Sequence, residues 1–309
     1  MLSRMSSRLA VSLCGISLKN PVLAASGTYG YGVEFKALTE LSALGGIVVK
    51  GLSREPMDGN PAPRLFESSA GMINSVGLQN IGVRAFVREK LPQLRDSGTA
   101  IFANIFGYSV DEYSEVARVL EDAEGVAGYE LNVSCPNTRH GGIYFSSDCA
   151  LLGELVGAVR RVARRPLIVK LSPNVARIEP FAVAAQEAGA DAISLVNTFV
   201  ALAIDAETRR PRIGAGFGGL SGPAIKPIAL RMVYEASRAV KIPVIGMGGI
   251  SSGVDAAEFL IAGASAVEVG TANFFDPQAP ARIARELEQF LERHKLASVA
   301  ELTGTLQMN

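Results

Sequence analysis

The sequence predicts an α/β fold in which eight parallel strands close into a barrel, a (β/α)8 fold of the TIM-barrel class. Short aliphatic runs alternate with amphipathic stretches along the chain, and eight such pairs can be counted. This alternation is typical of a parallel sheet, and eight units can close on themselves. No linker rich in Pro or Ser divides the 309 residues, so one domain spanning 1–309 is expected. An open, doubly wound sheet is the competing fold.

The elements are expected in the order that this fold requires. An N-terminal β-hairpin is expected first, because apolar runs flank a turn at Cys14-Gly15. The barrel strands are then expected at Pro21–Ala25, Gly46–Lys50, Ala100–Ile105, Tyr129–Val133, Leu167–Leu171, Ala192–Val196, Pro243–Gly246 and Ala266–Gly270. Helices are expected at Glu34–Ala43, Val83–Asp96, Asp111–Glu121, Leu151–Ala163, Pro180–Ala188, Lys226–Val240, Val254–Ala262 and Pro280–His294. The loops after strands 2, 4 and 6 are long, at Gly51–Gly82, Ser134–Asp148 and Asn197–Ile225. Loops at this end of such barrels build the active site.

The composition excludes several classes of function. Lys and Arg together number 30 and Asp and Glu also number 30, so no net field attracts nucleic acid or an anionic membrane. No apolar run reaches the roughly 18 residues that a spanning helix needs, and a cytoplasmic protein is expected. Three cysteines and two histidines at irregular spacing predict neither a disulfide framework nor a metal site.

Polar residues stand where the predicted strands end. Lys50 and Lys170 close two apolar runs, and an ammonium group at such a place needs an anion or an electron-rich ligand. Amide side chains, which both donate and accept hydrogen bonds, end three further strands. The interpretation of each residue alone as an ordinary loop residue stays open. Together they suit a planar, imide-like ring such as an isoalloxazine or a pyrimidine; the strand-end set is Ser26, Lys50, Asn104, Asn132, Lys170 and Asn197.

Glycines after the last two strands predict a phosphate site. Gly248 and Gly249 follow strand 7, and Gly270 and Thr271 follow strand 8. Loops at these positions often bind phosphate through backbone N–H groups and a nearby helix N-terminus. Gly222, in the turn before the sixth helix, adds a further contact. The alternative is that both segments are only tight turns.

A second glycine-rich segment is interpreted differently. Gly214–Gly219 matches GxGxxG, the pattern of a dinucleotide site, but it follows the charged segment Asp205–Arg212 rather than a strand. The strand–turn–helix context of that motif is therefore missing. We interpret the segment as a flexible covering loop and expect no nicotinamide site in this chain.

Cys135 is the candidate catalytic base. It lies just after strand 4 in a polar loop rich in Gly and Pro. A thiol with an ordinary pKa of about 8.5 can act as a base near neutral pH, particularly beside cations such as Lys50 or Arg139. An inert, structural cysteine is the alternative, and we assign that role to Cys14 and Cys149. His140 is interpreted as a loop residue.

Segments along nearly the whole chain resemble dihydroorotate dehydrogenase. They are ASGTYGYG (25–32), VVKGLS (48–53), NSVGLQNIG (74–82), ELNVSCPN (130–137), VKLSPN (169–174), SLVNT (194–198), GGLSGPAIKPIALRMVY (218–234), IPVIGMGGI (242–250) and VEVGTA (267–272). The runs NSVGLQN and NVSCPN are highly specific. The resemblance implies FMN as cofactor and oxidation of (S)-dihydroorotate to orotate in de novo pyrimidine (UMP) biosynthesis.

The resemblance also assigns roles to residues. The substrate should contact Lys50, Asn74, Ser75, Val76, Gly77, Leu78, Asn132, Asn197 and Thr198, with Asn137 as an addition. FMN should contact Ser26, Lys50, Gly51, Asn104, Asn132, Lys170, Val196, Gly222, Gly248, Gly249, Gly270 and Thr271. The hypothesis for the reaction is that the Cys135 thiolate removes the proton at C5 while a hydride leaves C6 for the flavin.

The cysteine base resembles class 1 of the family, since the membrane-associated, quinone-using class carries a serine there. Within class 1, FGGLSGPAIKPIALRMVY and NVSCPNTRHGG are more similar to the type 1B catalytic subunit. That type passes electrons to NAD through an iron–sulfur flavoprotein that binds FAD, in a heterotetramer of two plus two chains. Three alternatives stay open: a fumarate-linked class 1A homodimer, a reductase similar to dihydropyrimidine dehydrogenase, and a non-catalytic barrel that binds a phosphorylated ligand.

Overall fold

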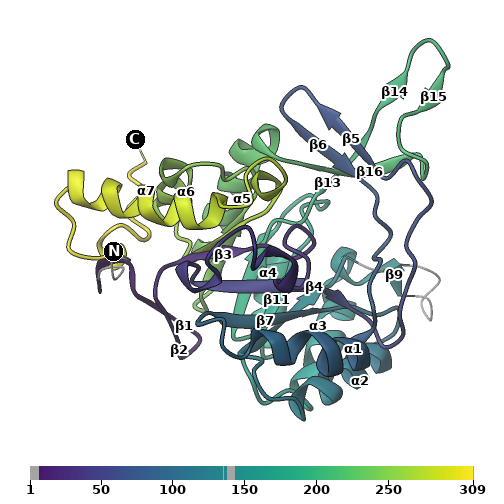
Figure 1. The fold of residues 1–309 in the computed structure, drawn as a ribbon, viewed down its shortest axis with the longest axis horizontal. Coiled ribbons are helices and arrows are strands. Elements are labelled where there is room, and N and C mark those ends of the chain that lie inside the picture. The colour runs from purple at the N-terminus through teal and green to yellow at the C-terminus, as the bar shows by residue number, and fades with distance from the viewer. Residues whose placement is uncertain (1–6, 135, 138–142, 309) are drawn as a thin grey trace.

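The computed structural model describes residues 7–134, 136–137 and 143–308, and its centre is the predicted closed barrel of eight parallel strands. Neighbouring strands around the barrel follow chain order, and the last strand pairs with the first. The arrangement is shown in Figure 1. The strands are β3 (Val22–Ala24), β4 (Gly46–Leu52), β7 (Ala100–Ile105), β8 (Gly128–Asn132), β11 (Leu167–Lys170), β12 (Ala192–Leu195), β17 (Val244–Met247) and β18 (Ala266–Val269). All eight overlap the ranges that the sequence predicted.

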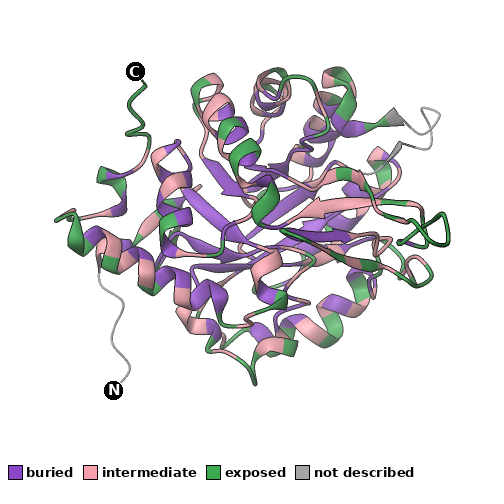
Figure 2. Ribbon diagram, turned by 90° about the horizontal axis from the view of Figure 1, so that it is seen from above, coloured by how far each residue is buried: buried purple, intermediate pink, exposed green. Residues whose placement is uncertain are grey.

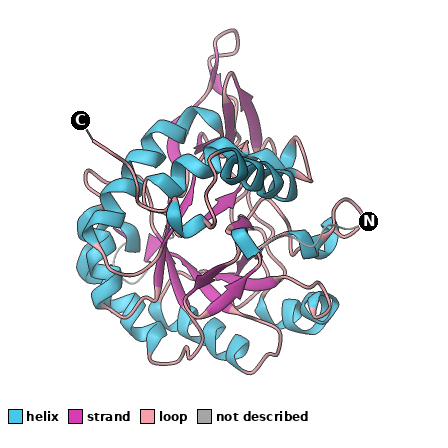
Figure 3. Cartoon of the chain, turned by 90° about the vertical axis from the view of Figure 1, so that its left-hand side faces the viewer, coloured by secondary structure: helices cyan, strands magenta, loops and turns pink. Residues whose placement is uncertain are grey.

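Six of the eight predicted helices are found around the barrel with ends shifted by at most three residues (Figure 3). They are α2 (Val110–Glu121), α3 (Cys149–Arg160), α4 (Glu179–Glu187), α5 (Lys226–Ala239), α6 (Gly253–Ile261) and α7 (Ala279–Arg293). Each presents apolar residues to the strands, and burial of these faces produces the main core between helices and sheet. The barrel strands are accordingly the most continuously buried part of the chain (Figure 2).

The other two helix predictions were wrong in form. The range Glu34–Ala43 contains two separate 3-10 turns, η2 (Val33–Phe35) and η3 (Leu41–Ala43), because the backbone is extended between them at Glu40. Thr and Ser, which are weak helix formers, lie in this range.

The range Val83–Asp96 is irregular as well. It comprises one α-helical turn, α1 (Val83–Ala85), a π-helical segment, η4 (Phe86–Lys90), and a 3-10 turn, η5 (Leu91–Leu94). Pro92 has no N–H with which to continue α-helical bonding, so a regular helix cannot pass through it.

A hairpin closes the end of the barrel at which the strands begin, as predicted. It consists of β1 (Val11–Leu13) and β2 (Ile16–Leu18), joined by Cys14 and Gly15 at positive φ. Leu13 and Leu18 pack against a separate layer of inward-facing apolar residues; the layer is Leu23, Val48, Phe102, Ile168, Ala192, Ile245 and Ala266. The barrel interior is therefore filled at this end, which leaves only the opposite end for a ligand.

A four-stranded antiparallel sheet stands over the opposite end. It is built from the long loops after β4 and β12, in the order β13 (Phe199–Leu202), β16 (Phe217–Ser221), β6 (Gly71–Asn74) and β5 (Leu65–Ser68). A small hairpin of β14 (Ile204–Asp205) and β15 (Arg210–Pro211) projects beyond it (Figure 1). In the long loop after β8, the fourth barrel strand, β9 (Pro136–Asn137) pairs with β10 (Ile143–Tyr144).

This sheet corrects the interpretation of Gly214–Gly219 as a covering loop. Part of the segment belongs to β16, which pairs with both β13 and β6. A Cβ at Gly218 would lie 2.6 Å from Ile73 Cγ2, and one at Gly219 would lie 2.0 Å from Thr198 Oγ1. These glycines therefore permit close packing of strands rather than flexibility.

In the described ranges, no helix combines the length and apolar character of a membrane-spanning segment.

Candidate active site

One cavity of about 930 Å³ opens at the ends of the barrel strands, under the four-stranded sheet. Most residues that the sequence analysis assigned to a substrate or cofactor line this cavity; the added Asn137 is not among them. The residues that line it are Ser26, Lys50, Gly51, Asn74, Ser75, Val76, Gly77, Leu78, Asn104, Asn132, Lys170, Val196, Asn197, Thr198, Gly222, Gly248, Gly249, Gly270 and Thr271. Residues far apart in the sequence thus form one site, as expected where parallel strands share an edge.

Cys135, the predicted base, lies outside the described residues, as does His140. The preceding residue, Ser134, lines the cavity. The two described cysteines, Cys14 and Cys149, do not line it. Burial and then the charge of Asp191 raise the pKa of Cys14 to about 11, so its thiol stays protonated at neutral pH. A protonated thiol outside the cavity agrees with a structural role for Cys14.

Two asparagines at the ends of non-adjacent strands are held together. Asn197 Nδ2 donates to Asn132 Oδ1 at 3.2 Å and to Ser134 Oγ at 3.0 Å. Asn197 Oδ1 accepts from the N–H of Thr198 at 2.8 Å, which sets the orientation of its amide. Asn74, on β6, donates to the carbonyl of Gly219 at 3.2 Å. These contacts fix amide groups on both sides of the cavity before any ligand arrives.

Lys170 lies at the base of the cavity in a buried cluster with two carboxyl groups. Its Nζ is 3.5 Å from Glu130 Oε1 and 3.9 Å from Glu268 Oε2. Glu130 also accepts from Asn104 Nδ2 at 2.6 Å and from Ser194 Oγ at 2.8 Å. Both glutamates are fully buried, so their charges are shielded very little by water.

The charge states in this cluster follow from its geometry. Burial, together with the neighbouring Glu130 carboxylate, raises the pKa of Glu268 well above its usual range. Burial alone would lower the pKa of Lys170, but Glu130 and Glu268 outweigh it and raise that pKa. Neither oxygen of Glu268 makes a hydrogen bond to the described residues. Because Lys170 lies closer to Glu130 than to Glu268, we interpret the cluster as an ion pair of Lys170 and Glu130 beside a Glu268 whose protonated form is favoured by burial.

Lys50 contributes a second cation. Its backbone N–H is bonded to the carbonyl of Gly30, but its ammonium group has no hydrogen bond or ion pair among the described residues. Burial and then the charge of Arg64 lower the pKa of Lys50. A half-buried ammonium of this kind is stabilised by an anionic or electron-rich ligand.

The glycine loops after β17 and β18 form a concave, donor-rich corner. No hydrogen bond among the described residues uses the N–H groups of Gly248, Gly249, Gly270 or Thr271. Gly249 has a φ of +77°, and a Cβ there would lie 2.7 Å from the carbonyl oxygen of Gly222. Thr271 Oγ1 donates to Ser221 Oγ at 2.8 Å, which joins the last loop to β16. Free backbone donors on a concave surface suit a phosphate.

Sequence reasoning missed several residues of the site. The cavity is also lined by polar residues of the long loops, namely Asn60, Gln79, Ser134, Ser172 and Asn174. Their signals in the sequence were their place in loops at the active end of the barrel and, for all but Asn60, their place in the segments that resemble the family. Glu130 and Glu268 carried a clearer signal, an acidic residue within an apolar strand, which is rare unless the charge is paired or neutralised.

Comparisons with known proteins identify the family. A model of the family described as dihydroorotate dehydrogenase matches residues 8–291. A protein of Solibacter usitatus named putative dihydroorotate dehydrogenase A (fumarate) is 72% identical over 303 residues, which cover 98% of this chain and 100% of that protein.

Several relatives carry the name dihydroorotate dehydrogenase B (NAD(+)), catalytic subunit. The protein of Geobacter metallireducens is 53% identical over 300 residues, covering 97% of this chain and 98% of its own. The protein of Citrifermentans bemidjiense is 51% identical, with the same coverage of both chains. The names of the relatives differ in the electron acceptor and agree in the oxidised substrate. This chain belongs to the dihydroorotate dehydrogenase family.

Proposed function

We propose that this chain, as a single FMN-binding domain, oxidises dihydroorotate to orotate in pyrimidine biosynthesis. The observation that carries the proposal is the meeting of three features in one cavity. A cluster of free backbone donors lies at one corner, two lysines lie along the floor, and an oriented asparagine pair lies beside them. A phosphorylated planar cofactor and a planar anionic substrate would use all three.

The residues present fit FMN. The glycine corner offers unused N–H groups for a phosphate, and a Cβ at Gly248 or Gly249 would lie 2.7 Å from a neighbouring protein atom, so the loop packs closely only with glycine there. Lys170 and Asn104 would hold the polar edge of the ring, supported from behind by Glu130. The chemistry supplied by bound FMN is acceptance of a hydride from C6 of dihydroorotate.

The chain's own residues would supply binding, orientation and one proton transfer. Asn132 and Asn197, already joined to each other, would hold the pyrimidine ring in a fixed plane. Lys50 would contribute positive charge toward the anionic substrate. Cys135, assigned from the sequence, would take the proton from C5. The cavity wall formed by the four-stranded sheet would limit the access of water.

We propose further that electrons leave through a partner subunit to NAD, which makes this chain the catalytic subunit of a type 1B enzyme in the cytoplasm. The chain has three cysteines, fewer than the four that most iron–sulfur clusters use as ligands. By the resemblance to type 1B, an iron–sulfur flavoprotein with FAD, in a heterotetramer of two plus two chains, would supply that route. The name of the Solibacter usitatus relative favours fumarate as the second candidate acceptor.

The test is an anaerobic titration of the purified yellow protein with dihydroorotate and, separately, with dihydrouracil. We expect stoichiometric bleaching of the flavin absorbance by dihydroorotate and little by dihydrouracil. Bleaching by dihydrouracil instead would indicate a reductase similar to dihydropyrimidine dehydrogenase. A colourless protein that stays free of flavin when offered FMN would contradict the proposal and favour a non-catalytic binding barrel. Adding fumarate or NAD to the reduced protein then separates the acceptors, and we expect NAD to react slowly without the partner.

A further inference from the structure

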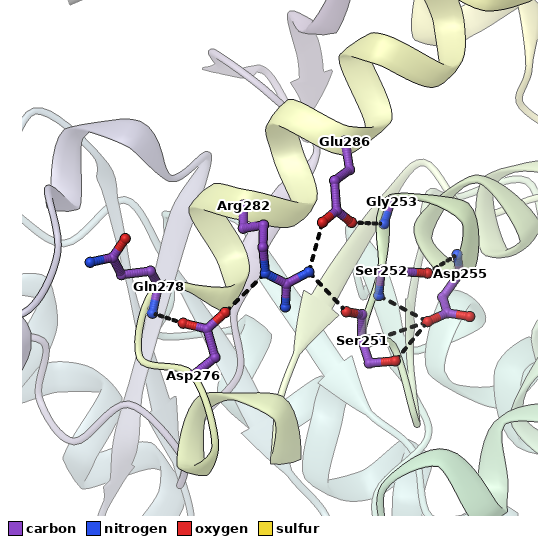
Figure 4. Close-up of polar contacts among 8 residues, drawn as sticks. All are labelled: Ser251, Ser252, Gly253, Asp255, Asp276, Gln278, Arg282 and Glu286. Carbon is purple, nitrogen blue, oxygen red and sulfur yellow. Dashed lines mark hydrogen bonds and ion pairs between the residues drawn. The ribbon is translucent and has the colours of Figure 1, made fainter.

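A single arginine outside the cavity joins the two loops that form the glycine corner. Arg282, on α7, donates through Nε to Asp276 Oδ2 at 2.9 Å and through Nη1 to Glu286 Oε1 at 2.8 Å. Nη1 also donates to the carbonyl of Ser251 at 3.3 Å. Figure 4 shows the guanidinium between the carboxylates of Asp276 and Glu286, with Ser251 on the same side of it as Glu286.

Two contacts of this guanidinium, to Ser251 and Asp276, lead to the glycine loops, and the third, to Glu286, stays within α7. Ser251 follows Gly249 by two residues in the loop between β17 and α6. Asp276 follows the 3-10 turn η9 (Thr271–Phe274), and its N–H is bonded to the carbonyl of Ala272 at 2.9 Å. The two loops follow the paired strands β17 and β18, and the guanidinium joins them a second time through a bridge with a fixed, planar geometry.

The same network occupies the N-terminus of α6. Glu286 Oε2 accepts from the N–H of Gly253 at 2.7 Å, and Asp255 forms a capping box with Ser252. Asp255 also accepts from the N–H of Ser251 at 2.9 Å. The positive end of this helix is therefore already balanced by two carboxylates. An anion in the cavity would have to be held by the backbone N–H groups of the glycine loops instead.

We propose that Arg282 is a positioning residue for the phosphate group of FMN. Arg282 does not line the cavity. It holds the loop of Gly248 and Gly249 and the loop of Gly270 and Thr271 at a separation that lets N–H groups from both reach one phosphate. The inference rests on the proposed function, because it requires FMN as the ligand of this site. Hydrogen bonds to phosphate weaken steeply once donors move out of range, so loosening the bridge weakens phosphate binding specifically.

The test compares FMN with riboflavin, which has the same ring and no phosphate. Arg282→Lys keeps the positive charge but cannot bridge Asp276 and Glu286 with one planar group. By equilibrium dialysis of the flavin-free full chain, we expect its Kd for FMN to rise about tenfold, while its Kd for riboflavin changes less than about twofold. Arg282→Met should give the same selective loss.

Matched controls and outcomes keep the inference falsifiable. Arg231→Met removes a comparable ion pair, since Arg231 contacts Glu235 one turn away on α5, and it should leave both affinities unchanged. Equal weakening of FMN and riboflavin in the Arg282 variants would assign Arg282 to general stability and overturn the inference. If Arg282→Lys binds FMN as tightly as the parent while Arg282→Met does not, the positive charge matters and the bridge does not. That result would also overturn the inference. A parent protein that binds no FMN would contradict the proposed function itself.

Discussion

Asn197 donates its amide to Asn132 Oδ1 across 3.2 Å, which joins the loop after β12 to the end of β8. The strand between them, β11, ends in Lys170. Three consecutive strands of the barrel therefore present two amides and one ammonium to the same cavity. Because the amides orient each other, the site is ordered before a substrate ring is placed in it.

Asn197→Ala should reduce turnover without removing the cofactor. The change deletes the donor to Asn132 and Ser134, so the substrate ring loses a contact and Asn132 loses its fixed orientation. Misplacement of a reacting group by about 1 Å can cost about 10²-fold, and we expect a loss of that order in kcat/KM. Steady-state kinetics with dihydroorotate and flavin content per chain provide the readout. A control is Gln93→Ala, which removes an exposed amide outside the cavity. Unchanged kcat/KM in Asn197→Ala would contradict the assignment.

The two glutamates beside Lys170 should respond differently to the same substitution. Glu130→Gln removes the counter-charge of a buried ammonium and should destabilise the fold by about 3 kcal/mol or more. Glu268→Gln replaces a group that we assign as neutral and should cost about 1 kcal/mol. Denaturant unfolding measures both, and equal losses would contradict the assignment of charge.

The pH dependence of stability tests Glu268 separately. Because burial and Glu130 raise the pKa of Glu268 in the folded state, unfolding releases its proton once the pH exceeds the usual carboxyl range. The stability of the parent should therefore fall as the pH rises, until the raised pKa is reached. Glu268→Gln lacks this proton, so we expect a shallower decline between about pH 5 and pH 8. Parallel curves for parent and variant would show that Glu268 is already ionised.

Two glycines with similar positive φ values provide a matched test of the phosphate corner. Gly249 and Gly216 have φ values of +77° and +84°, so alanine should cost about 1–2 kcal/mol of backbone strain at either position. A Cβ at Gly249 meets the carbonyl of Gly222 at 2.7 Å, whereas one at Gly216 meets nothing within 4 Å. We expect Gly249→Ala to weaken FMN binding at least about tenfold and Gly216→Ala to leave it unchanged. Equal FMN affinities in the two variants would argue against a phosphate at this corner.

Much of the barrel and its site could be predicted from the sequence, because the pattern that specifies them is local. A polar residue at the end of an apolar run can be placed from the local sequence alone, because parallel strands end at one edge of the sheet. Lys50, Asn104 and Asn197 were placed in this way, and the structure brings them to one cavity.

The remainder depends on contacts between distant segments. The pKa of Glu268 is raised because barrel closure buries it near Glu130, which no window of the sequence contains. Arg282 bridges two loops and its own helix, and its sequence neighbours do not indicate that role. The glycines of β16 were interpreted as flexible because the sequence does not show the strand that packs against them.

The central claim is that a thiol at position 135 removes a proton from a substrate held in this cavity. Stopped-flow measurement of flavin reduction by dihydroorotate tests it most directly. The comparison is between the parent, Cys135→Ala and Cys149→Ala, the last of which removes a cysteine outside the cavity. We expect Cys135→Ala to keep its FMN and lose at least about 10²-fold in the reduction rate, and Cys149→Ala to behave as the parent. A rate for Cys135→Ala close to that of the parent would contradict the account.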